Sequence, residues 1–148
     1  FLKILKYLKK LYAYVVVDTT PLLTDITLSA IDESDVVILV TTQDIPSIKN
    51  ARLFLDLLGT LNVDRERVVF AMNRHDKRIG ITPENLKLDV AAAIPLDERV
   101  VIPSVNRGVP FVLENKTQPV TKSIFALAES IRSRISKLEQ SEVDTGLL

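Results

Sequence analysis

The chain has 148 residues, and its 19 Lys and Arg residues balance its 19 Asp and Glu residues. This length suits one ordinary domain with a buried core, and the zero net charge excludes an overall field that would attract nucleic acid or an anionic membrane. The absence of Cys and the single His exclude disulfide scaffolds, thiol chemistry, zinc fingers and His-rich metal sites. The four glycines lie too far apart to form a phosphate-binding loop.

The first half of the chain predicts helices and strands in alternation. Residues 1–11 have the apolar spacing of an amphipathic helix. Residues 14–17 form a continuous apolar run that is typical of a strand buried on both faces, and this run ends at Asp18. The elements expected next are a helix over residues 24–31 with Thr24 as its cap, a strand over residues 36–40 and a helix over residues 46–58.

The second half predicts further strands and helices. A buried strand is expected over residues 68–72, directly before Asn73. The elements expected after it are a helix that starts at residues 82–84, a strand over 89–94, a short helix over 98–106 that Gly108 ends, and a long helix over 120–138. We expect residues 1–138 to form the domain and residues 139–148 a flexible tail. This alternation predicts an α/β fold with a mostly parallel sheet and helices on both faces.

Polar residues follow the predicted strands, and in open parallel sheets ligands bind beyond the carboxyl ends of the strands. Asp18 suits a carboxylate that holds a nucleotide's magnesium ion through a water. The side-chain amide of Asn73 can both donate to and accept from an adenine edge, and residues 94–97 form a rigid turn. Plainer explanations are turn chemistry or helix capping for Asp18, an Asx turn for Asn73, and a strand end followed by a helix cap for residues 94–97.

Several segments, taken in order, resemble one protein family. They are residues 14–21, 35–42, 47–52, 72–77, 80–82, 94–97 (IPLD) and 105–110 (VNRGVP). Together they resemble the second half of the MinD/ParA-type ATPases, a deviant branch of the P-loop superfamily. Within that superfamily they are most similar to the CpaE/TadZ branch tied to Flp-type pilus assembly. The resemblance covers almost the whole chain.

The resemblance implies an incomplete P-loop ATPase fold from which the phosphate-loop strand is missing. It also implies ATP or ADP with Mg²⁺ as ligands, and a homodimer that encloses ATP. The site residues that it implies are Asp18 as the Walker B carboxylate, catalytic and bound to Mg²⁺ through a water, Asn73 and Arg74 beside adenine, and Pro95, Leu96 and Asp97 in the turn that closes over the base.

The chain departs from the family pattern in three places. It has no counterpart of the lysine-bearing phosphate loop, which is expected in a segment before Phe1, so this chain alone is not expected to hydrolyse ATP. Thr20 and Pro21 stand where MinD members often carry a glycine, which makes hydrolysis a weaker expectation than binding. The segment over residues 83–89 is shorter than the family's helix there.

The function that the resemblance implies is an ATPase that positions or organises pilus or secretion assembly machinery. Its partners would be the assembly proteins, and it would act in the cytoplasm, at the inner face of the membrane or at the cell pole. One alternative is a non-catalytic localisation scaffold of the same fold. Another is a phospho-receiver domain, which needs an acidic pair after its first strand and a lysine after its last, and the sequence does not supply them.

Charge patterning bears on two further kinds of partner. The candidates for a DNA-binding patch are Lys122, Arg132, Arg134 and Lys137. An exposed helix face explains these residues more simply, so nucleic acid binding is not expected. Residues 139–148 are acidic, whereas a membrane-anchoring tail would be a basic amphipathic helix, so no direct anchor is expected in the tail.

Overall fold

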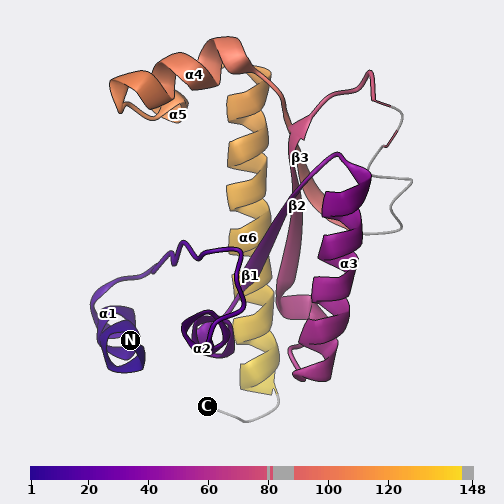
Figure 1. Cartoon of the computed structure of the whole chain (residues 1–148). Coiled ribbons are helices and arrows are strands. Elements are labelled where there is room, and N and C mark those ends of the chain that lie inside the picture. Colours follow the sequence, from indigo (N-terminus) through magenta and orange to yellow (C-terminus); the bar gives the residue numbers. More distant parts are fainter. Residues whose placement is uncertain (80, 82–88, 145–148) are drawn as a thin grey trace.

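The computed structural model of the chain describes residues 1–79, 81 and 89–144 (Figure 1). In chain order its elements are α1 (Leu2–Leu11), α2 (Asp25–Glu33), β1 (Val37–Thr42), α3 (Ile45–Thr60), the 3₁₀ helix η1 (Arg65–Arg67), β2 (Val68–His75), β3 (Val90–Pro95), α4 (Glu98–Arg107), α5 (Phe111–Glu114) and α6 (Pro119–Asp144). Within the described ranges no helix is both long enough and apolar enough to cross a membrane.

The described strands form one parallel sheet in the order β1-β2-β3, which confirms the predicted parallel α/β architecture. The pairing of β1 with β2 is regular along its length, for example Leu39 opposite Phe70. The pairing of β2 with β3 shifts register at two places, between Phe70 and Ala71 and between Met72 and His75. An irregularity of this kind locally disrupts the ladder, and the second one lies near the carboxyl end of β2.

Helices cover both faces of the sheet. Figure 1 shows α3 on one side of the strands and α6 on the other. On the α3 side, Ile48 and Ala51 of the helix pack with Phe70 and Met72 of β2. The apolar run of β2 is therefore buried on both faces, as its lack of alternation predicts.

Side-chain caps fix several helix ends where the sequence predicts them. Thr24 accepts a hydrogen bond from the backbone N–H of Thr27 at the start of α2, and Asp97 does the same for Val100 at the start of α4. Gly108 ends α4 with φ 66°, in the left-handed region that favours glycine. These caps confirm the expected positions of both helices.

The strand expected over residues 14–17 is wrong. This segment is extended but lies in no sheet, and the side chain of Val16 is 88% exposed. An apolar, β-branched run becomes a strand only where a neighbouring backbone supplies hydrogen-bond partners, and no described strand pairs with this segment.

Helix α6 continues to Asp144, beyond the predicted end of the long helix at residue 138. The flexible tail over residues 139–148 stays a prediction. The predicted helix start at residues 82–84, most of the short segment over residues 83–89, and residues 145–148 lie outside the described residues.

Candidate functional site

The carboxyl ends of the three parallel strands meet at one edge of the sheet, named here the carboxyl edge. The residues at this edge are Thr42, Gln43 and Asp44 after β1, Asn73, Arg74 and His75 at the end of β2, and Pro95, Leu96 and Asp97 at and beyond the end of β3. Five of the six predicted site residues therefore lie here, and Asp18 does not belong to any strand end.

Asn73 and Arg74 lie in an irregular stretch of β2, close to its carboxyl end. The Asn73 Oδ1 accepts a hydrogen bond from the backbone N–H of Arg74 at 2.9 Å, and Arg74 has φ 56°, a value uncommon outside glycine. Within the part of the chain that the structure describes, the Asn73 Nδ2 donates to no partner. The bond to Arg74 occupies the oxygen of this amide and leaves the nitrogen available as a hydrogen-bond donor.

The two segments predicted to face a base are joined directly. The backbone N–H of Leu96 donates to the carbonyl oxygen of His75 at 3.0 Å, and Pro95 lies opposite His75 in the strand register. The Nδ1 of His75 is buried and has no hydrogen-bond partner among the described residues, so it does not face a ligand. The carboxyl edge thus combines the apolar side chains of Pro95 and Leu96 with the polar side chains of Asn73 and Arg74.

The charged side chains at this end of β2 and β3 form one weak ion pair and one helix cap. The Arg74 guanidinium lies 3.9 Å from the Glu98 carboxylate, and both side chains are about 64% exposed, so this ion pair contributes little. Asp97 uses Oδ1 to cap α4, where it accepts from the N–H of Val100 at 3.2 Å. Arg74 is therefore available to contact a ligand, whereas Asp97 has a structural role already.

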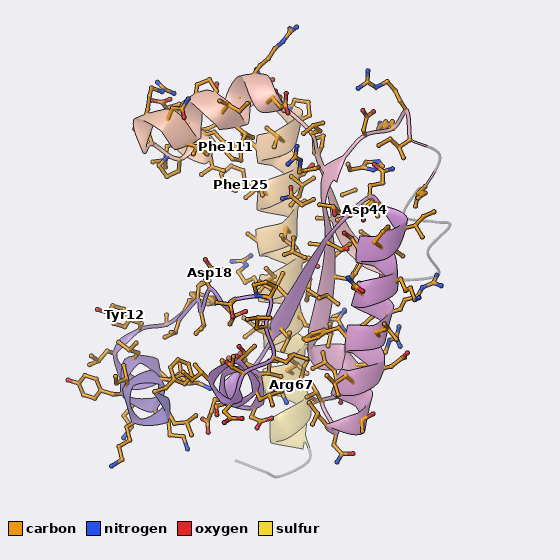
Figure 2. All side chains as sticks on the ribbon, viewed as in Figure 1. Tyr12, Asp18, Asp44, Arg67, Phe111 and Phe125 are labelled. Atoms are coloured by element: carbon orange, nitrogen blue, oxygen red, sulfur yellow. The ribbon has the colours of Figure 1, made fainter. Side chains whose placement is uncertain are left out.

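Asp18 is exposed on the extended segment between α1 and α2. Figure 2 shows it well apart from Asp44, which lies at the carboxyl edge. Among the described residues, no group of three or more His, Asp or Glu side chains could hold a metal ion. One carboxylate is not a magnesium site by itself, so Mg²⁺ would need phosphate oxygens or ligands from elsewhere.

Two polar residues that follow β1 are not among the predicted site residues, although they stand at a strand end. Asp44 caps α3 by accepting from the backbone N–H of Ser47 at 2.9 Å. The pKa of Asp44 lies below its ordinary value. The hydrogen bond from the Thr42 hydroxyl is the largest cause, and the hydrogen bonds from Ser47 add to it. An Asp two residues before a Pro is a helix-start signal that could have found this cap.

Gln43 is the second of these residues, and its side chain is 6% exposed. Its side-chain amide bonds the backbone of the segment that follows β2, at Asp76, Ile79 and Ile81. No local pattern in the sequence signals these contacts, because the partners lie more than thirty residues away along the chain.

Comparison with known proteins identifies the fold. No family model matches the chain. The septum site-determining protein MinD of Thermotoga maritima is 27% identical over 149 residues, which is 95% of this chain. The solved MinD of Aquifex aeolicus superposes with a TM-score of 0.76 over 89% of the chain at 22% identity, and a ParA family ATPase of Chlorobium tepidum with 0.77 over 85% at 21%. The chain has the MinD/ParA-type ATPase fold.

The MinD/ParA-type fold is only partly spanned by this chain. The chain covers 54% of the Thermotoga MinD, 59% of the Aquifex MinD and 55% of the Chlorobium ParA family ATPase. The Aquifex protein has also been solved in a MinC:MinD complex, which this chain matches with the same TM-score of 0.76. The fold predicted from the sequence is thus confirmed, and the CpaE/TadZ branch stays a prediction.

Proposed function

We propose that this chain is the carboxyl-terminal part of an ATP-binding MinD/ParA-type ATPase and supplies the adenine-facing side of its nucleotide site. The hydrogen bond from Leu96 N–H to His75 O carries the proposal, because it joins the end of β2, which bears Asn73, to the segment that begins at Pro95. Ligands of open parallel sheets bind at this edge.

The residues present fit an adenine base. The free Nδ2 of Asn73 would donate to a ring nitrogen of adenine, and the planar guanidinium of Arg74 would lie against the base. Pro95 and Leu96, of which Leu96 is 42% exposed, would cover its apolar surface. Asp97 would act indirectly, because its cap holds the turn at the start of α4.

The residues present do not by themselves fit the phosphates. Asp18 is the one carboxylate of this chain that we assign to Mg²⁺, through a water, and it stands alone among the described residues. Bound Mg²⁺ would neutralise charge on the phosphates. We therefore propose that the phosphates are held by a part of the fold that this chain does not span, and that this chain alone does not hydrolyse ATP.

The open edge of the sheet supports the proposal that the phosphate-loop strand is missing. Among the described strands, β1 lies at one edge of the sheet, and its Ile38 and Val40, which share one face of the strand, are 41% and 56% exposed. Natural edge strands are commonly protected by charges or Pro, and β1 (VILVTT) contains neither. A further strand beside β1 would cover this edge.

At the level of the cell, we propose a homodimer of the CpaE/TadZ branch that organises pilus or secretion assembly proteins at the inner face of the membrane. The relatives support a positioning role, because one is named a septum site-determining protein and another is a cell division protein. The MinC:MinD complex supports a protein partner for such a fold. The branch assignment rests on the IPLD and VNRGVP segments.

A non-catalytic scaffold of the same fold is the second candidate. Two observations favour it: Thr20 and Pro21 follow Asp18 without a glycine, and Asp18 is exposed on a segment apart from the carboxyl edge. Such a scaffold would dimerise, with or without nucleotide, and would not hydrolyse ATP.

The proposed function is tested on the protein at its full natural length by equilibrium dialysis with ATP and Mg²⁺, together with an ATP turnover assay. Asn73→Asp keeps the oxygen that bonds the Arg74 N–H and removes the donor nitrogen, so it should weaken ATP binding by about tenfold. Asn50→Asp, at an exposed position of α3, is the matched control and should bind as the unmodified protein does. Binding without turnover would favour the scaffold, and no ATP binding would overturn the proposal.

A further inference from the structure

Gln43 is a buried polar side chain that directly follows β1. It is 6% exposed, and a buried amide is tolerated only where its hydrogen-bonding groups are satisfied. Among the described residues, its partners are backbone groups of Asp76, Ile79 and Ile81. The side chain therefore links the end of one strand to the connection that leaves the next.

The contacts use both ends of the amide. The Gln43 Oε1 accepts from the backbone N–H of Asp76 at 2.7 Å. The Nε2 donates to the carbonyl oxygen of Ile79 at 3.3 Å and to that of Ile81. The Ile81 side chain also packs against the core cluster of α3 and β2, so the segment is held by polar and apolar contacts together.

These contacts begin next to the proposed base site. Arg74 has φ 56°, and such a conformation persists only where the surrounding structure holds it. The residues that follow it are held on two sides: the His75 carbonyl by the N–H of Leu96, and the Asp76 N–H by Gln43. The second of these anchors is the one made by a side chain.

We propose that Gln43 is a positioning residue for recognition of the base. By fixing Asp76 it holds the irregular end of β2 that directs the Asn73 amide and the Arg74 guanidinium toward the ligand, without touching the ligand itself. This inference rests on the proposed ATP-binding function and adds to it the residue that sets the selectivity for adenine. Removing the anchor would leave the donor present but loosely placed, which lowers selectivity more than fold stability.

Two substitutions separate the contacts of Gln43. Gln43→Met has a similar length and removes all three hydrogen bonds. Gln43→Glu keeps an acceptor for the Asp76 N–H and removes the donors to Ile79 and Ile81. Gln140→Met, at an exposed position of α6, is the control.

The experiment measures, on the full-length protein, the ratio of the dissociation constants for GTP and ATP, and the hydrogen-exchange rate of the Asp76 amide. Gln43→Met should speed the exchange of the Asp76 amide and lower the GTP-to-ATP ratio of dissociation constants about tenfold. Gln43→Glu should lower this ratio less than Gln43→Met does. Gln140→Met should leave the ratio unchanged. A merely structural role would lower the folded fraction for both nucleotides equally and leave the ratio unchanged. An unchanged ratio with faster exchange would therefore overturn the inference. If the unmodified protein binds neither nucleotide, the proposed function itself is wrong, and the inference fails with it.

Discussion

The backbone N–H of Leu96 lies 3.0 Å from the carbonyl oxygen of His75, and this hydrogen bond closes the carboxyl ends of β2 and β3 against each other. It places the end of β2, which carries the amide donor of Asn73, beside the apolar side chains of Pro95 and Leu96. That combination is what an aromatic base needs: a few directed polar contacts and an apolar cover. The proposed function depends on this edge more than on any single side chain.

Arg67 is expected to stabilise the fold by holding the end of α2. Its Nη2 donates to the carbonyl oxygens of Ile31, at 2.9 Å, and Ser34. Arg67→Ala should lower the free energy of unfolding by about 1–3 kcal/mol, because helix-end carbonyls lose their partner. Urea denaturation measures this. Arg65→Ala, an exposed position in the same 3₁₀ helix, should have little effect, and equal losses for the two would contradict the assignment.

Leu58 and Leu53 of α3 provide a matched pair for core packing. Leu58 is 1% exposed and packs with Ile31 and Val63, whereas Leu53 is 58% exposed. Leu58→Ala should cost about 2–5 kcal/mol through lost burial and the cavity that it leaves. Leu53→Ala should cost about 0.5 kcal/mol or less. Thermal and urea unfolding of both variants check this, and a reversed order would mean that the exposed face of α3 is covered in solution.

Replacing Gly108 and Gly59 by alanine should change the free energy of unfolding in opposite directions. Gly108 has φ 66° and open space around its Cβ position, so Gly108→Ala should destabilise by about 1 kcal/mol through backbone strain alone. Gly59 lies within α3, also with open space, so Gly59→Ala should stabilise by about 0.5–1 kcal/mol. Differential scanning calorimetry distinguishes the two. A stabilising Gly108→Ala would refute the left-handed end of α4.

Asp76 should titrate below its ordinary range. Hydrogen bonds from Arg78, with N···O distances of 2.5 to 3.0 Å, lower the pKa of Asp76 from 3.8 to about 2. Because the folded-state pKa is the lower one, the stability from this contact is present above about pH 4 and is lost as the pH falls through about 2. NMR titration of the carboxyl carbon measures the pKa. In Arg78→Ala it should move back toward 3.8, and an unchanged value would exclude Arg78 as the cause.

Local patterns predicted most of the fold. The unbroken apolar runs of β1, β2 and β3 predicted a parallel sheet. Thr24, Asp97 and Gly108 marked helix ends, because capping involves only residues that are close together in the sequence. Residues 14–17 have the same apolar character as these strands and yet lie in no sheet. Strand formation depends on a neighbouring backbone, which the run itself does not encode.

The position of the candidate site was predictable from the sequence, but the contacts that hold its residues in place were not. Strand ends pointed to Asn73 and to residues 94–97, but the register shift between Met72 and His75 is a property of the pairing of β2 with β3. The anchoring by Gln43 and the capping by Arg67 join residues 33 and 36 positions apart. Such contacts follow from the folded arrangement and leave no periodic signal in the sequence.

The central claim is that the carboxyl edge of β2 and β3 binds adenine, and NMR mapping tests it most directly. The ¹⁵N-labelled chain is titrated with adenosine, and the backbone amide shifts are followed residue by residue. The account predicts that the shifts concentrate at Asn73, Arg74, Leu96 and Asp97, and that Asn73→Asp diminishes them. Shifts that avoid this edge, or no saturable shifts with adenosine, would contradict it.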